Sequence, residues 1–460
     1  MENIENTPKE PLNLLGLTML GLGGAIGSGI FVAIGIAINQ AGPAIILAFV
    51  IAAIISSLIM RMLAEMSVYE TSCGSFSVFA QEYLGPAVGF ISGWIYWLTG
   101  ILTLATEMIA AALILRFWFP SWPIWLISLF IEALIIGISL LDVKVFARLE
   151  EILSLIKVGI LVVIIVIGVV LFTGAWPGIK SPGLTNFLGD GGFFPQGWKG
   201  IFSSLLLVLY TFAGEQVIGL AVGETQEPEI TVPKAVTITN VTLFVLYLGA
   251  IATLVGIIPW QQIPQNASGF VPLFRELHMA SVTGIMNAVI LSAILSAMNS
   301  NMYGVPRMLK SLADRHYAPA LLSKLDHEGV PRSSVFLSSI FLLIVVGISY
   351  VLPQTIFIYI ASASGVTFLI NWIIIALTHL RFRKRLMENT GDRQLSYRNF
   401  PYTTLIVILL LLVALSTSAL NKHQMVGLEI GMILLLLLSI AYFLLTKFQN
   451  LQKSDHEPYN

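Results

Sequence analysis

Two apolar segments of this 460-residue chain contain glycines where a continuous helix would otherwise be expected. The first, GGAIGSGIF, begins at Gly23, and the second, LYTFAGEQVIGLAVGE, has Gly214 and Gly219 on either side of Glu215. Each glycine inside a helix costs about 1 kcal/mol relative to alanine. Unwound backbone offers N–H groups that suit an anion and carbonyl groups that suit a cation. The chemistry indicated is the binding of a zwitterion, of which an amino acid is the simplest case.

Close helix packing is the alternative explanation for the glycines, because small residues let membrane helices approach one another. Two features favour the binding interpretation. Unwound backbone in hydrocarbon is tolerated only where it lines a cavity or contacts a ligand. In addition, glycine-interrupted segments at corresponding places in two halves of a chain are typical of transporter binding sites.

Several ionisable side chains interrupt the apolar segments, and each is costly enough to require a reason. Lys157, in EEILSLIKVGILVV, could exchange a proton because burial disfavours its charged form; alternatively it extends to the membrane edge or only pairs with a carboxylate. Glu107, in TLATEMIAAALIL, could face a substrate amine, join a proton path or make a structural hydrogen bond. Glu132 and Glu429 also interrupt apolar runs, and no pattern assigns them a role.

Three polar residues with near-helical spacing, Ser292, Ser296 and Asn299, either line a coupling site with Lys157 or hold membrane helices together. The six histidines include no pair at metal-ligand spacing with a third ligand, so we expect no metal and no cofactor. No nucleophile and base form a recognisable pair, so we do not expect an enzyme. The single cysteine, Cys73, excludes an internal disulfide framework.

The composition predicts the elements that must position these residues. The chain is 57% hydrophobic and 11% charged, whereas soluble domains are roughly 25% charged. Its apolar blocks have the length of about 20 residues that crosses a bilayer. We therefore expect an all-α polytopic membrane protein with twelve transmembrane helices. The predicted spans are 16–39, 43–64, 87–115, 122–140, 149–173, 198–223, 235–258, 281–306, 334–352, 355–380, 402–420 and 424–446.

The distribution of Lys and Arg predicts the orientation, because these residues favour cytoplasmic loops. With the N-terminal tail (1–15) inside, the inner loops contain most of them, including the run RFRKRL. The C-terminal tail (447–460) is then also cytoplasmic. No clustered basic face indicates a nucleic-acid partner. The opposite loops contain only Arg116, Lys180, Lys199, Arg275 and Lys422.

Five segments in order resemble the amino acid–polyamine–organocation superfamily and, within it, the amino acid transporter family of permeases. GGAIGSGIF resembles the signature of the first helix, and NQAGPA (39–44) the turn after it. GLAVGETQEPEITVPKAV (219–236) resembles the exit of span 6. SAMNSNMYGVPRMLKSLADRHYAPALLSKLDHEGVP (296–331) resembles the exit of span 8, and THLRFRK (378–384) the end of span 10. The similarity covers nearly the whole chain.

The resemblance implies the LeuT-type fold, with 16–173 and 198–380 as two inverted repeats of five spans. Their first helices, spans 1 and 6, would both be broken, and 402–446 would lie outside this core. It also implies secondary active uptake of an amino acid across the cell membrane, with a proton as the usual coupling ion. The expected partners are therefore an amino acid, a proton and the lipid bilayer.

The resemblance also implies which residues of this chain bind the substrate and the proton, because they match the family's motifs by position. The substrate carboxylate would meet backbone N–H groups near Gly27, Ser28 and Gly29. The ammonium would meet the carbonyl groups of Ala25 or Ile26 and of Tyr210, Phe212 and Ala213, and either Tyr210 or Phe212 would cover the site. Lys157 matches the lysine that, in proton-coupled relatives, lies where sodium-coupled members bind sodium. Glu107 resembles the membrane-embedded glutamate of these permeases. The substrate-binding residues implied in this way are Ala25, Ile26, Gly27, Ser28, Gly29, Tyr210, Phe212, Ala213, Gly214 and Glu215.

The second break departs from the family pattern, in which Gly and a small residue usually precede Glu. Here Glu215 directly follows Gly214, which displaces the acid by about 100° around a helix. Glu215 therefore either selects a cationic side chain or hydrogen-bonds within the break. We expect proton-coupled uptake of a neutral L-amino acid by alternating access. The alternatives are an amino acid or amine exchanger, a cationic amino acid permease, and a sensor that does not transport.

Overall fold

The structure is a computed structural model that describes residues 11–69, 76–140, 143–189, 191–265, 268–276, 282–327, 329–351, 356–390 and 400–454. Residues 1–10 and 455–460 of the predicted tails lie outside the described residues, as does Cys73. Every regular element in the described part is a helix. The α-helices are α1 (Leu14–Ala25), α2 (Ile34–Ala41), α3 (Ile45–Tyr69), α4 (Phe76–Leu84), α5 (Pro86–Leu115), α6 (Ile124–Ser139), α7 (Val143–Phe172), α8 (Thr185–Leu188), α9 (Gly197–Tyr210), α10 (Pro228–Ile257), α11 (Val271–Glu276), α12 (Val282–Asp314), α13 (Arg332–Val351), α14 (Ile356–Thr390), α15 (Tyr402–Ser418) and α16 (Lys422–Ser454).

Eight helical stretches among the described residues are long and apolar enough to cross a membrane. The first, Leu14–Tyr69, contains two of the predicted spans, and three shorter apolar helices correspond to others: Ile124–Ser139, Arg332–Val345 and Tyr402–Ser418. Several helices continue beyond the predicted limits, notably α14, which extends to Thr390. Hydropathy marks the edge of the apolar segment, whereas the helix itself continues through polar residues. The short helices α4, α8 and α11 were not predicted.

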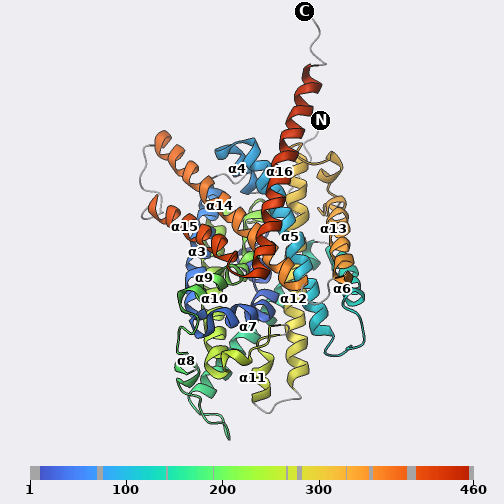
Figure 1. The fold of residues 1–460 in the computed structure, drawn as a ribbon. Coiled ribbons are helices and arrows are strands. Elements are labelled where there is room, and N and C mark those ends of the chain that lie inside the picture. The colour runs from blue at the N-terminus through green and yellow to red at the C-terminus, as the bar shows by residue number, and fades with distance from the viewer. Residues whose placement is uncertain are drawn as a thin grey trace, which may run out of the picture.

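The helices pack around α5, which contacts α12 and α14 (Figure 1). The helix pair α6 and α13 lies on one side of the molecule, and α8 and α11 lie at the end opposite α4 (Figure 1). The interrupted first segment lies inside this bundle. Its helix α1 packs against α7, α10 and α12, and every residue from 20 to 38 is buried.

The first predicted span is three helical pieces. Asn13 caps α1 by accepting a hydrogen bond from the Gly16 N–H at 2.8 Å, and α1 ends at Ala25. Ile26 is extended, with ψ at 91°, so its peptide groups leave the helical ladder. A π-helical turn, η1 (Gly29–Ala33), then leads into α2. The chain therefore unwinds between Ile26 and Ser28, at the glycine-rich sequence.

The sixth predicted span is interrupted as well. After α9 ends at Tyr210, the chain continues as two 3₁₀ helices, η3 (Ala213–Leu220) and η4 (Val222–Glu224). The two interrupted segments cross at Gly24 and Gly214, because η3 packs directly against α1. A Cβ added to Gly214 would overlap the backbone carbonyl of Gly24, and one added to Gly24 would lie 2.5 Å from the Gly214 carbonyl oxygen. The close-packing interpretation is therefore correct for this pair of glycines.

The crossing generates a stability prediction. Gly214→Ala should destabilise the protein by about 1–3 kcal/mol, because the added methyl meets backbone that cannot rotate away. The matched control is Gly223→Ala, in η4, where nothing lies within 4 Å of an added Cβ. The apparent unfolding temperature of the detergent-solubilised protein should fall clearly for the first variant and hardly change for the second. Equal unfolding temperatures for the two variants would contradict the crossing.

Candidate functional site

The N–H side of the first break is occupied by Glu107 of α5. The backbone N–H of Ser28 donates to both carboxylate oxygens of Glu107, at 3.1 Å and 2.8 Å. Glu107 also lies beside Gly27, where an added Cβ would be 2.6 Å from its Oε1 atom. Ser28 and Glu107 are both buried, so the Glu107 carboxylate replaces the water that would otherwise satisfy the Ser28 N–H group. The chain's own carboxylate therefore contacts a backbone donor predicted to bind a substrate carboxylate.

The carbonyl side of the same break is occupied by Lys157 of α7. Its Nζ atom donates to the carbonyl oxygen of Gly23 at 2.5 Å and to that of Ile26 at 3.3 Å. The lysine side chain is fully buried. It does not extend to the membrane edge, because its ammonium is held on the carbonyl groups that unwinding exposes. An ammonium and a carboxylate of the protein thus satisfy opposite sides of one break.

Glu150, two helical turns before Lys157, is the counter-ion of the lysine. Its Oε1 atom lies 3.8 Å from the lysine Nζ. The Ser296 hydroxyl donates to this carboxylate at 2.6 Å and the Asn299 amide at 3.0 Å, both from α12. The Ser154 hydroxyl lies 3.1 Å from both Glu150 Oε1 and the Met19 carbonyl oxygen, so it can donate to either. Burying an ion pair is expensive, and these donors offset part of that cost.

Tyr247 of α10 joins the two breaks. Its hydroxyl lies 2.8 Å from the carbonyl oxygen of Ala25 and 3.0 Å from that of Thr211, so it can donate to either. Its ring packs edge-on against Phe212, with ring centroids 5.1 Å apart, and both rings contact Phe49. Phe212, one of the two aromatic residues that the family resemblance offers as a cover for the substrate, therefore belongs to an aromatic cluster at the breaks.

Several buried polar atoms around the two breaks have no hydrogen-bond partner among the described residues. They are found on both interrupted segments, which are buried throughout this region. Such atoms are rare in folded proteins, because each costs free energy when it is removed from water without a partner. Those at the breaks are available to pair with a polar ligand. These atoms are Ser28 Oγ, Tyr210 OH, Glu215 Oε1, Glu215 Oε2 and Gln216 Oε1.

Comparison with known proteins identifies the class of ligand. The family model for amino acid permeases matches residues 16–457. The chain belongs to the amino acid permease family. It is 33% identical to the gamma-aminobutyric acid permease of Bacillus subtilis (strain 168), over 100% of this chain and 98% of that protein. It is also 33% identical to the amino-acid permease AapA of the same organism, over 94% of each chain.

Membership in this family indicates the general function of the protein. The protein is a multi-pass membrane protein, and its family indicates amino acid transport. An uncharacterized amino acid permease of Bacillus subtilis (strain 168), named YvbW, is 35% identical to this chain over 96% of this chain and 98% of that protein. The zwitterion expected from unwound backbone and the substrate class of the family therefore agree.

The structure brings most of the sequence-predicted residues together and adds two. Ser296 and Asn299 donate hydrogen bonds to Glu150 and make no described hydrogen bond with Lys157. The Ser292 hydroxyl donates to the carbonyl oxygen of Val289 in its own helix. Glu150 and Tyr247 were missed. The seven-residue spacing to Lys157 places Glu150 on the same helical face, which was a usable signal. Tyr247 had none beyond a polar tip in an apolar helix.

Glu132 and Glu429 lie outside this cluster. Glu132 is buried on α6, and neither of its carboxylate oxygens has a hydrogen-bond partner among the described residues. Glu429 lies on the exposed surface of α16. Neither residue contacts the interrupted segments through any described hydrogen bond, so the structure gives no reason to include them in the site.

A second charged cluster closes the end of the interrupted sixth segment. Arg307 of α12 donates through Nε to the Glu224 carboxylate at 2.9 Å, and the Tyr303 hydroxyl also donates to it. The N–H of Leu12 donates to the Glu224 carbonyl at 2.7 Å, which ties the start of the chain to the same place. Burial acts to raise the pKa of Glu224, but Arg307 and Tyr303 outweigh it and hold this pKa below its ordinary value.

This cluster predicts a pH dependence of stability. Because the folded-state pKa of Glu224 is depressed, its ionised form stabilises the fold at neutral pH. That contribution is lost as the pH falls below the ordinary pKa of about 4.3 and through the lower folded value. Glu224→Gln should therefore cost about 1–2 kcal/mol at pH 7 and lose less stability than the wild type on acidification.

Unfolding temperatures measured from pH 7 to pH 3 test this prediction. The control is Asp314→Asn, which removes the exposed pair between Lys310 and Asp314, 2.7 Å apart, and should change little. Parallel acid profiles for the wild type and Glu224→Gln would show that Glu224 carries no such linkage.

Proposed function

We propose that the protein takes up a zwitterionic amino acid together with a proton, by alternating access. The observation that carries this proposal is Glu107 on the Ser28 N–H, at 2.8 Å and 3.1 Å. A substrate carboxylate needs the same donor, so the two carboxylates compete for it. Protonation removes the negative charge of Glu107 and weakens its hold on this N–H. Substrate binding and proton uptake are thereby linked, because each favours the same state of the site.

The opposite charge of the substrate has acceptors available. Carbonyl oxygens carry two lone pairs, so those of Ala25 and Ile26 can accept a substrate ammonium in addition to their present partners. In the second break, the carbonyl groups of Tyr210, Phe212 and Ala213 would complete the shell, as the family resemblance implies. The unpartnered Ser28 and Tyr210 hydroxyl groups would supply further hydrogen bonds to the carboxylate. A side chain at Gly27, Gly29 or Gly214 would meet Glu107, Thr211 or Gly24, so these glycines keep the groups around the proposed site in close contact.

Lys157 would control the movement of the first segment. Its charged form holds the Gly23 and Ile26 carbonyl groups against α7, and its neutral form would hold them less strongly. Loss of this proton to the cytoplasm would release α1 and open the site inward. Transfer of the proton from Glu107 to the neutral lysine would then reset both groups. One proton crosses the membrane per cycle in this scheme.

The proposal includes the architecture that alternating access requires. We propose twelve spans in the cell membrane, with 16–173 and 198–380 as inverted repeats of the LeuT type and both termini cytoplasmic. The crossing of two interrupted segments at Gly24 and Gly214 supports it, as does the distribution of Lys and Arg. The helices at 402–446 would lie outside the moving core.

The preferred substrate is an amino acid without net charge on its side chain. One relative is named as a permease of gamma-aminobutyric acid, a zwitterion with no further charge. A cationic amino acid is the second candidate, because both carboxylate oxygens of Glu215 are buried without a partner. In an uptake assay with reconstituted vesicles, competition by lysine and the loss of this competition in Glu215→Gln would favour this second candidate.

Uptake into reconstituted vesicles tests the coupling. An inward proton gradient should drive accumulation of the amino acid without sodium, and Lys157→Ala should reduce this accumulation at least tenfold. The matched control is Lys180→Ala, which changes an exposed lysine in a loop and should transport normally. Strict sodium dependence would refute proton coupling. Counterflow that persists without a gradient and after Lys157→Ala would indicate an exchanger, and binding without flux would indicate a sensor.

A further inference from the structure

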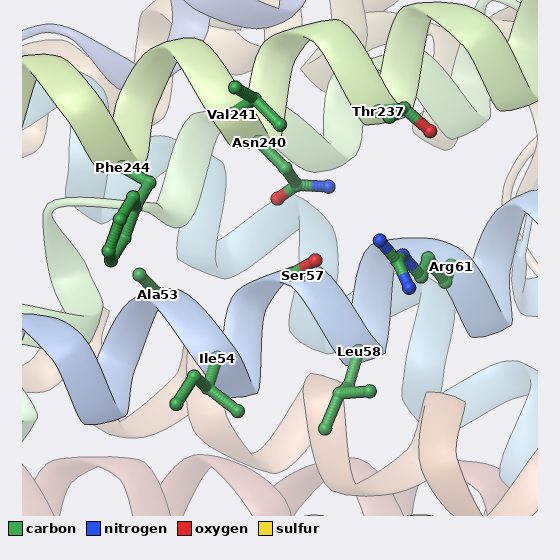
Figure 2. Close-up of a pocket in the computed structure, with 9 residues that line it drawn as sticks. All are labelled: Ala53, Ile54, Ser57, Leu58, Arg61, Thr237, Asn240, Val241 and Phe244. Carbon is green, nitrogen blue, oxygen red and sulfur yellow. The ribbon is translucent and has the colours of Figure 1, made fainter.

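A groove on the outer surface, between α3 and α10, lies apart from the two interrupted segments. It encloses a space of about 260 Å³. Its rim faces the surroundings of the protein, because Ile54, Val241 and Phe244 are 53%, 58% and 38% exposed. In a multi-pass membrane protein these surroundings are lipid. The lining residues are Ala53, Ile54, Ser57, Leu58, Arg61, Thr237, Asn240, Val241 and Phe244 (Figure 2).

The groove is polar at one end and apolar at the other. The two helices run antiparallel here, so Arg61 of α3 lies near Thr237 of α10, and Ala53 lies near Phe244 (Figure 2). Ser57 lies between these ends. Figure 2 shows the Arg61 guanidinium turned into the space between the helices. At 1.5 Å per residue, the eight residues from Arg61 to Ala53 span about 12 Å.

Arg61 lacks the carboxylate partner that its position along the helix offers. Glu65 is one turn further along α3, but its oxygens bind Arg383 at 2.6 Å and His379 at 3.0 Å, both on α14. Among the described residues, no carboxylate lies within ion-pair distance of Arg61, and no residue lining the groove is acidic. Lys234, three residues before Thr237 and on the same helical face, adds a second exposed cation.

Arg61 lies three residues before the end of its predicted span (43–64), which is the depth of the lipid phosphates. The planar guanidinium matches a phosphate through two parallel hydrogen bonds. The Ser57 hydroxyl lies beside it as an additional donor. The apolar end, with Ala53 and Phe244, suits methylene groups, each of which gains about 0.8 kcal/mol on burial. Phosphate at one end and hydrocarbon along the rest is the chemistry of a membrane phospholipid.

We propose that this groove is a binding site for an anionic glycerophospholipid. The phosphate lies on Arg61, the glycerol backbone lies near Ser57 and Asn240, and the first methylene groups of one acyl chain lie along Ala53 and Phe244. A net negative headgroup is preferred over a zwitterionic one, because the groove presents Arg61 and nearby Lys234 with no acidic side chain among its lining residues. This site is separate from the amino acid site and adds a lipid ligand to the transporter.

Native mass spectrometry of the delipidated full chain in detergent tests the proposal. The probes are dioleoyl phosphatidylglycerol, dioleoyl phosphatidylcholine with the same chains, and glycerol 3-phosphate without chains. The wild type should retain phosphatidylglycerol, and retain phosphatidylcholine and glycerol 3-phosphate much less. Arg61→Gln should weaken phosphatidylglycerol retention about tenfold, the loss expected for a charge-assisted hydrogen bond. Arg381→Gln, at an exposed arginine of α14 outside the groove, is the matched control and should bind normally.

Variants that fill the apolar end distinguish lipid binding along the groove from the attraction of an anion to Arg61 alone. Ala53→Trp should weaken phosphatidylglycerol retention while Arg61 is intact. Val241→Trp, at an exposed lining position, is the second filling variant if the first does not fold. Equal retention of phosphatidylglycerol by the wild type and Arg61→Gln would overturn the proposal. Equal retention of phosphatidylcholine, binding of glycerol 3-phosphate as tight as that of the lipid, or indifference to a folded filling variant would also overturn it.

Discussion

The unwound backbone at Ile26 and Gly27, directly before Ser28, imposes the constraint on which the rest of the site depends. Inside a membrane protein, each peptide group that leaves the helical ladder must find another partner. Here the partners are side chains from three other helices: Glu107 on an N–H group, and Lys157 and Tyr247 on carbonyl groups. The break is therefore stable only while charged or polar side chains of α5, α7 and α10 are directed at it.

This arrangement explains why the ionisable residues of the core lie together. Once Lys157 is drawn to the carbonyl groups of α1, it needs a counter-ion, and Glu150 lies 3.8 Å away. Glu150 in turn needs donors, which α12 supplies through Ser296 and Asn299. One interruption in one helix thus determines polar residues on several neighbouring helices. The proposed transport cycle uses the same contacts, because changing the proton on Glu107 or Lys157 changes which backbone groups are free.

The glycines serve both interpretations of the sequence. Gly24 and Gly214 allow two backbones to touch, and Gly23 gives room to Glu150 and Ser300. Gly27 lies against Glu107 and Ala297, where the break offers its N–H groups. Close packing and ligand binding are therefore linked, because a bulkier residue at the crossing would separate the segments whose backbone groups the proposed substrate must contact.

The sequence was sufficient to predict an all-helical membrane protein and the position of both interruptions, because glycine clusters and apolar blocks are local signals. Glu150 was missed because EEILSLIK begins at a predicted membrane edge, where acidic residues usually face water. Its partners Ser296 and Asn299 come from a helix more than a hundred residues away, and no single-sequence pattern records that pairing. The extension of α14 to Thr390 was missed for another reason: charged residues end a hydrophobic span but are good helix formers.

The most direct test of the competition between Glu107 and the substrate carboxylate is to measure proton uptake when an amino acid binds. The solubilised protein would be placed in weakly buffered solution with a pH-indicator dye and given whichever of the twenty amino acids stabilises it most against heat. We predict uptake of about one proton per bound amino acid near neutral pH in the wild type, and none in Glu107→Gln, which cannot be protonated there. Amino acid binding without proton uptake in the wild type, or with equal uptake in Glu107→Gln, would contradict the account.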